Sequence, residues 1–93
     1  MTENESVKEL EYLPLDDNKY WSSHDLGCSA ALVSLGFDLI SLDKENPQKV
    51  KFIFQSTEDI EEVIKEYWDS GLQVDAQTYF NSLKRLKNQI YSE

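Results

Sequence analysis

The spacing of apolar residues changes from segment to segment along this chain, and this change restricts the fold more than any other feature of the sequence. Alternation of apolar and polar residues is typical of a half-buried strand, whereas recurrence every three to four residues is typical of an amphipathic helix. One stretch alternates clearly: Val50, Phe52 and Phe54 fall on one side, and Lys51 and Ile53 fall on the other. We therefore predict a strand there, with one face turned toward a core.

Two more strands are expected. Residues 37–42 precede the alternating stretch, separated from it by a polar loop that contains the turn-forming pair Asn46-Pro47. These two strands are predicted to form a β-hairpin with a long connection. A shorter strand is expected at Tyr20-Trp21.

The first predicted helix runs from about Ser23 to Leu35. Ser22 is the expected N-cap, Asp25 completes a capping box three residues later, and Gly36 suits the position just after the helix. The apolar residues of this segment lie on two sides, and several of its residues are small. We expect a central, buried helix between the sheet and another helix.

Two further helices are expected in the last third of the chain. The second helix should start at its cap, Ser56, and end at Gly71. Its predicted buried stripe comprises Ile60, Val63, Ile64, Tyr67 and Trp68. Asp75 is the expected cap of the third helix, which runs from Ala76 to about Tyr91.

The predicted fold class is α+β, with the element order β-α-β-β-α-α. A three-stranded, mostly antiparallel sheet would carry three helices, mostly on one face, in a two-layer arrangement. One such domain is expected to span residues 20–93, because a chain of 93 residues holds a single core.

Residues 1–19 are predicted to form an acidic arm outside that domain. They contain six acids and two lysines. Four apolar side chains can dock the arm on the domain or on a partner: Leu10, Tyr12, Leu13 and Leu15. The simpler interpretation is a partly mobile tail.

The third helix carries the one basic cluster of an otherwise acidic chain. Six apolar side chains fall within about 140° of arc and are predicted to pack on the domain: Tyr79, Phe80, Leu83, Leu86, Ile90 and Tyr91. Arg85 lies opposite this stripe, Lys84 at its edge and Lys87 inside it. Lys87 is either a snorkelling lysine whose amine reaches water or a cation placed for a carboxylate or a ligand. The bases also suit the negative end of the helix dipole, which explains their position without any function.

Composition restricts the function classes. The 18 acids against 9 bases give a formal charge of −9, which disfavours nucleic-acid binding without excluding a local basic surface. The single cysteine cannot form an intramolecular disulfide, the acidic N-terminus is unlike a signal peptide, and no apolar run is long enough to span a bilayer. We expect a cytoplasmic protein that does not associate with a membrane.

No set of side chains has the spacing of a catalytic or metal site. Ser23, His24 and Asp25 are the residue types of a hydrolase triad, but neighbours on a helix point in different directions. Cys28 is expected to be a small core residue, although His24 lies within reach on the same helix face. The loop acids Asp43 and Glu45 lack the spacing of a calcium loop, and no glycine-rich phosphate loop is present. We therefore expect no enzymatic activity, cofactor, metal or small-molecule substrate.

Two tryptophans are the other candidates for a contact surface. Trp21 and Trp68 are both expected in the core; if either were exposed, it would be the best anchor for a protein partner.

Several short runs resemble a family of small bacterial and phage proteins catalogued only as a domain of unknown function. They are Trp21 to Gly27, Ala30 to Phe37, Asp43 to Pro47, Tyr67-Trp68, Asp75 to Phe80 and Leu83 to Lys87. The resemblance covers about residues 20–92. It implies a setting in prokaryotes and their mobile elements, but no activity, ligand or functional residue.

Three hypotheses for the function follow. The leading one is a non-enzymatic interaction or adaptor module with a protein partner. The second is an accessory nucleic-acid binder that uses Lys84, Arg85 and Lys87. The third is an acidic inhibitor whose second helix mimics phosphates through Glu58, Asp59, Glu61, Glu62, Glu66 and Asp69; a solvated helix face explains the same residues.

Overall fold

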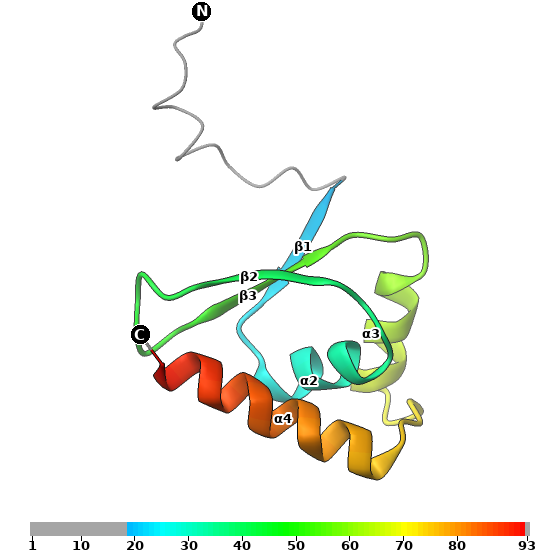
Figure 1. Cartoon of the computed structure of the whole chain (residues 1–93). Coiled ribbons are helices and arrows are strands. Elements are labelled where there is room, and N and C mark those ends of the chain that lie inside the picture. Colours follow the sequence, from blue (N-terminus) through cyan, green and yellow to red (C-terminus); the bar gives the residue numbers. More distant parts are fainter. Residues whose placement is uncertain (1–18, 93) are drawn as a thin grey trace, which may run out of the picture.

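The computed structural model describes residues 19–92, and it confirms the predicted α+β fold and the order of its elements (Figure 1). The elements are β1 (Tyr20–Ser23), α2 (Leu26–Ser34), β2 (Leu39–Asp43), β3 (Lys51–Gln55), α3 (Ile60–Trp68) and α4 (Ala76–Tyr91). The three helices lie on one side of the three-stranded sheet. The predicted acidic arm lies outside the described residues except for Lys19.

The sheet has the order β1-β3-β2, and both strand pairs are antiparallel. Because β1 and β2 each run antiparallel to β3, they run parallel to one another, and α2 is the crossover between them. β3 therefore occupies the middle of a split β-α-β unit. The central strand is the one whose alternation the sequence shows, and its Phe52 and Phe54 are both buried.

A β-bulge in β2 changes which of its residues face the core. Leu39 pairs with Phe54 and Ser41 pairs with Ile53, so Ile40 is the extra residue, and it is 48% exposed. Leu39 and Leu42 are an odd number of positions apart and would face opposite sides of a regular strand. The bulge allows both to pack against the core. This irregularity also explains why β2 lacks a clean alternation in the sequence.

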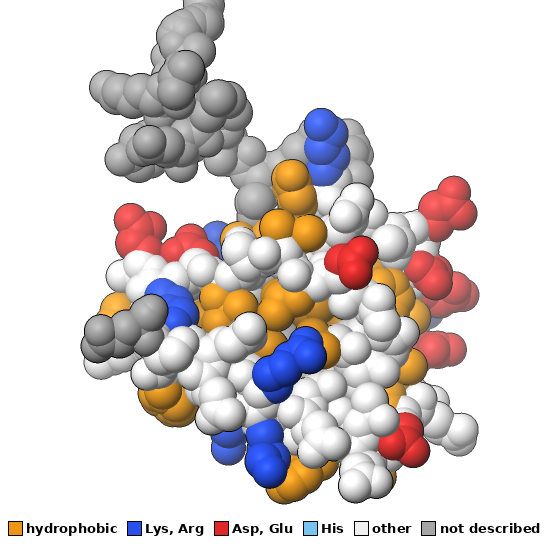
Figure 2. Space-filling model, viewed as in Figure 1, with side chains coloured by type: hydrophobic (Ala, Val, Ile, Leu, Met, Phe, Trp, Pro, Cys, Tyr) orange, Lys and Arg blue, Asp and Glu red, His pale blue; other side chains and the backbone are white. Residues whose placement is uncertain are grey.

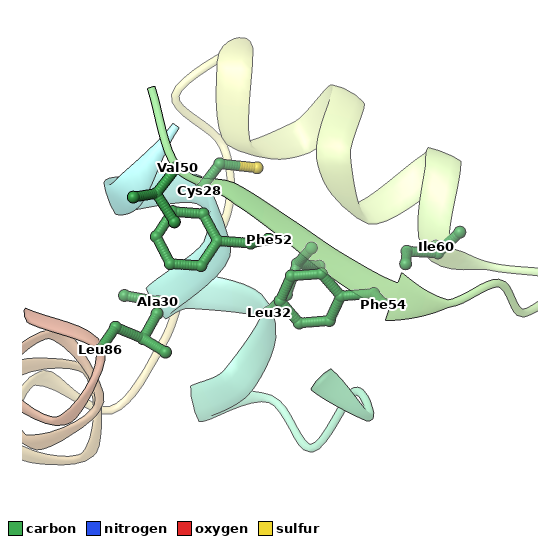
Figure 3. Close-up of a cluster of buried hydrophobic side chains, with 8 residues drawn as sticks. All are labelled: Cys28, Ala30, Leu32, Val50, Phe52, Phe54, Ile60 and Leu86. Carbon is green, nitrogen blue, oxygen red and sulfur yellow. The ribbon is translucent and has the colours of Figure 1, made fainter. Parts of the chain in front are cut away.

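The core joins all three helices to the sheet (Figure 3). Cys28, Ala30 and Leu32 come from α2, and they meet Phe52 and Phe54 of β3. The remaining buried members are Val50, which precedes β3, Ile60 from α3 and Leu86 from α4. α2 also contacts both α4 and α3, so it is the central buried helix that the sequence predicts.

The predicted starts of the first two helices are wrong, and in both cases strand pairing is the reason. β1 extends through Ser22 and Ser23, which pair with β3, so α2 begins at Leu26 and Asp25 is its N-cap. The Asp25 carboxylate accepts a hydrogen bond from the Cys28 amide at 2.7 Å. Ser56 likewise donates its amide to the Lys19 carbonyl beside β1, and α3 begins only at Ile60.

Two helix ends use the same hydrogen-bonding pattern but different residues in the left-handed position. Gly36 has φ of 99° after α2, as the sequence predicts. After α3 that position is taken by Ser70, with φ of 64°, rather than by Gly71. In this motif the Ser70 amide donates to Tyr67 and the Gly71 amide donates to Glu66. Ser70 therefore holds a conformation that is unfavourable for a residue with a β-carbon.

We predict that Ser70→Gly raises the free energy of unfolding by up to about 1 kcal/mol. The gain is the left-handed penalty of roughly 1–2 kcal/mol, reduced by the greater backbone entropy of glycine in the unfolded chain. Urea unfolding followed by circular dichroism measures it. Ser70→Ala is the matched control, because it removes the hydroxyl and keeps the β-carbon; a gain of the same size in this control would contradict the explanation.

The first turn of α2 is a point of close contact with the other two helices. A β-carbon on Gly27 would lie 2.6 Å from the Tyr67 hydroxyl, 3.4 Å from the Tyr79 hydroxyl and 3.5 Å from the Asp25 carboxylate. The Tyr79 hydroxyl also donates to the Gly27 carbonyl at 3.4 Å. Burial raises the pKa of the Tyr67 hydroxyl, and the Asp25 carboxylate adds to that shift. Gly27 is thus required by space rather than by backbone conformation.

We predict that Gly27→Ala lowers the free energy of unfolding by about 1–3 kcal/mol, as is usual for overpacking. In a Tyr67→Phe background the nearest atom is gone, and the same change should be neutral or slightly stabilising because alanine favours a helix. A double-mutant cycle by denaturant unfolding measures the coupling. In a Tyr79→Phe background the hydroxyl that is removed is the more distant one, so Gly27→Ala should still lower the free energy of unfolding by most of that amount. An equal cost in all three backgrounds would contradict the steric explanation.

Candidate functional site

α4 begins where the sequence predicts, at a strong cap. The Asp75 carboxylate accepts hydrogen bonds from the Thr78 hydroxyl at 2.7 Å and from the Thr78 amide at 2.9 Å. These two bonds lower the pKa of Asp75 below its usual value, and the bond from the hydroxyl has the larger effect. The cap fixes the first turn and therefore the starting point of every face of the helix.

The rotation of α4 about its own axis is set by the residues that meet α2. Leu86 is fully buried, Ser82 is buried, and Tyr79 donates to Gly27. The Ser82 hydroxyl donates to the Thr78 carbonyl at 2.8 Å, so the hydroxyl keeps a hydrogen-bond partner although it is buried. Leu83 and Ile90, both partly buried, complete the face that packs on the domain.

Two aromatic residues predicted in the buried stripe of this helix are exposed instead. Phe80 is 56% exposed and Tyr91 is 83% exposed. The prediction was wrong because it counted only apolar residues, whereas the small polar Ser82 lies in the packed face. The residues that are packed in the structure, namely Tyr79, Ser82, Leu83, Leu86 and Ile90, are centred roughly 60° around the helix from the predicted stripe. That shift moves Phe80 and Tyr91 into solvent.

We define the α4 face as Phe80, Lys84, Lys87 and Tyr91. Their spacing places all four within about 60° of arc on one flank of the helix, and all are exposed. The Lys84 ammonium lies 5.3 Å from the centre of the Phe80 ring, a cation–π contact. α4 has no acidic residue along its length. Figure 2 shows lysine and arginine side chains gathered over α4, beside exposed hydrophobic atoms.

The other predicted basic residue lies away from this face. Arg85 is exposed, but it projects about 100° around the helix from Lys84. Lys87 is exposed on the α4 face, so it is not a lysine inside a packed surface. The question that the sequence raised about Lys87 thus came from misplacing the centre of the stripe.

The two tryptophans differ in their surroundings. Trp21 is partly buried, and its ring centre lies 6.0 Å from that of Phe54, so the expectation of a core position is met. Trp68 is 60% exposed, so the same expectation is wrong for this residue. It lies at the last position of α3, where its ring meets the edge of Tyr67 at 4.9 Å between centres. Trp68 is therefore a further exposed aromatic residue, on α3 rather than on α4.

The acids of the second predicted helix all lie in solvent. They are Glu58 and Asp59, which precede α3, and Glu61, Glu62, Glu66 and Asp69. Figure 2 shows acidic side chains along the side of the molecule where α3 lies. Lys65 is exposed on the same side of α3 as Glu61 and Glu62, which interrupts the negative surface. The charges of α3 and α4 therefore have opposite signs.

The polar side chains around the start of α2 form hydrogen bonds with backbone atoms. Ser23 accepts from the Asp25 amide, Asp25 caps α2, and His24 lies 3.1 Å from the Val50 carbonyl through Nδ1. These contacts point in three directions. Cys28 is 1% exposed, and burial, with a smaller contribution from Asp25, raises its pKa to about 11, so the sulfur stays a thiol at neutral pH.

The hairpin loop has an open hollow lined by His24, Asp43, Glu45, Asn46, Lys49 and Lys51. Within it, the Asp43 side chain accepts from the Glu45 amide and the Asn46 side chain accepts from the Gln48 amide. Across residues 19–92, no three histidine, cysteine or acidic side chains are grouped so that they could hold a metal ion. In the same part of the chain, no helix has the length and apolar character needed to cross a membrane.

A family described as a domain of unknown function, DUF5659, matches residues 18–92. The chain belongs to this family. The match covers every described strand and helix, including the α4 face, and leaves out most of the predicted arm. No curated protein and no solved structure matches the chain.

The sequence identifies the lysines of the α4 face as candidate binding residues but places its two aromatic residues in the core, so the face as a whole is missed. A lysine in the middle of an apparent apolar stripe was the feature that could have revealed it, because lysine is rarely packed inside a core. The chemistry of the α4 face is that of a contact surface: two aromatic rings give apolar area, and two ammonium groups attract anions.

Proposed function

We propose that the chain is a cytoplasmic, non-enzymatic interaction module that binds a protein partner on the α4 face. The observation that carries the proposal is the exposure of Phe80 and Tyr91 at the two ends of a surface with two lysines between them. Aromatic residues dominate the binding energy of many protein interfaces, whereas isolated surface lysines contribute little. A prokaryotic or phage setting rests on the resemblance alone and remains part of the proposal.

The charge of the α4 face favours an acidic segment on the partner. Lysines at the rim of an interface steer association and restrict the choice of partner more than they add affinity. The aromatic residues would then supply the affinity by covering apolar side chains of the partner. Trp68 lies on α3 and is not required for this contact.

A capture experiment with matched variants tests the proposal. The tagged full chain is expressed in the cells where it naturally occurs, and the co-purifying proteins are quantified by mass spectrometry. We expect at least one protein to be enriched by the wild type and by Arg85→Glu. Its recovery should fall steeply in Phe80→Ala/Tyr91→Ala, since each truncated anchor costs about 2 kcal/mol, which is about thirtyfold in affinity.

Arg85→Glu controls for the charge change, because Arg85 neighbours Lys84 in sequence but lies outside the α4 face. Lys84→Glu should reduce recovery, whereas Arg85→Glu should not. The proposal fails if the wild type is a monomer with no enriched protein, or if the two charge reversals have equal effects.

Nucleic-acid binding is the second candidate, and the contact between Lys84 and Phe80 favours it. Aromatic rings beside basic residues are the usual platform on which single-stranded bases stack. The formal charge of −9 opposes this function at long range.

Binding to single- and double-stranded DNA and RNA at low and moderate salt tests this candidate. If it is right, the change of all three of Lys84, Arg85 and Lys87 to Gln should abolish binding. Phosphate contacts give a slope of about 0.7 per contact in a plot of log affinity against log salt for single strands, and Lys84→Gln should lower it by about that amount. Absence of binding by the wild type at low salt would rule the function out.

The phosphate-mimic hypothesis for α3 remains a prediction. Exposure of its acids suits either mimicry or simple solvation, and the position of Lys65 among them favours solvation.

A further inference from the structure

The sequence that precedes β1 is chemically complementary to the α4 face. Residues 1–18 contain six acids and one base, Lys8, whereas α4 contains three bases and no acid. The same residues also include four apolar side chains in the part of the sequence nearest to β1, namely Leu10, Tyr12, Leu13 and Leu15. The α4 face has the matching features: lysines for the carboxylates, and Phe80 and Tyr91 for the apolar side chains.

The point where this segment joins the domain disfavours a contact with α3. The Lys19 carbonyl accepts a hydrogen bond from the Ser56 amide at 2.8 Å, which places the junction just before Glu58 and Asp59. Both of these acids are exposed, and four more acids follow on α3. Like charges repel an acidic segment from this side of the molecule. The grouped bases of α4 offer the opposite sign.

The segment is longer than the face that it would cover. Eighteen extended residues span about 60 Å, whereas the α4 face is about 16 Å long from Phe80 to Tyr91. A weak contact is also sufficient, since linking two groups in one chain gives an effective concentration on the order of millimolar.

We propose that residues 1–18 bind the α4 face of their own molecule and cover it until a partner displaces them. The carboxylates pair with Lys84 and Lys87, and the apolar side chains cover Phe80 and Tyr91. The inference rests on the α4 face being the docking surface of the proposed function, and it adds an internal competitor for that surface.

Paramagnetic relaxation in the full chain tests the contact. A nitroxide is attached to the Ser6→Cys variant, in which the native Cys28 is protected by its burial at 1% exposure. Amide signals of the ¹⁵N-labelled protein are compared before and after reduction of the nitroxide. We expect loss of signal along α4, centred between Phe80 and Tyr91, with little loss in α3.

Two matched charge reversals make the test specific. Lys84→Glu should restore the α4 signals, whereas Arg85→Glu should leave them attenuated, since Arg85 lies outside the α4 face. Salt at 1 M should also restore them, because the screening length falls to about 3 Å.

The proposal is overturned if attenuation is absent, falls mainly on another element, or disappears equally in both reversals. It is also overturned if a mixture of nitroxide-labelled ¹⁴N protein and unlabelled ¹⁵N protein shows the attenuation, because the contact would then join two molecules. The two tests have separate readouts, because one measures the recovery of a partner and the other measures signal loss on α4. A captured partner without α4 attenuation would thus reject only this inference, and attenuation without a partner would reject only the proposed function.

Discussion

The burial of α2 between the sheet and the other two helices is the constraint on which the rest of this structure depends. Its small residues allow this position: Cys28, Ala30 and Ala31 are buried, and Gly27 leaves room for two tyrosine hydroxyls. A larger side chain at any of these positions would displace a packed neighbour in the sheet or in another helix, because protein interiors are close-packed. The helix is only nine residues long, so its stability depends on this packing more than on intrinsic propensity.

The exposed α4 face follows from that packing. The Tyr79 hydroxyl reaches the first turn of α2, and Ser82 lets the two helices approach closely. Together with Leu86, these contacts determine which side of α4 faces inward. The neighbour of Tyr79 in sequence, Phe80, must then point outward with the lysines that follow it on the same flank. Exposure of the α4 face is therefore a consequence of how α4 is seated on α2.

The sequence predicts the parts of the fold that local patterns control. Alternation identifies β3, and Asp75 identifies the start of α4, because no long-range contact competes with either. The sequence misplaces the parts that pairing controls. Ser22 and Ser56 are good caps by type, but Ser22 pairs with β3 and the Ser56 amide donates to the Lys19 carbonyl just before β1. The bulge at Ile40 and the burial of Ser82 likewise depend on partners distant in sequence. The burial of Ser82 is the reason why the sequence places Phe80 and Tyr91 wrongly in the core.

Net charge is a poor guide to what this molecule can bind. The chain carries a formal charge of −9, which by itself suggests a basic partner. At physiological ionic strength the screening length is about 8 Å. The charges within that distance of a bound group, the lysines first at the α4 face, therefore act on it more strongly than the net charge of the chain. The separation of charge between two helices gives an acidic chain a local basic surface, and the acidic composition of its own N-terminal sequence is complementary to that surface.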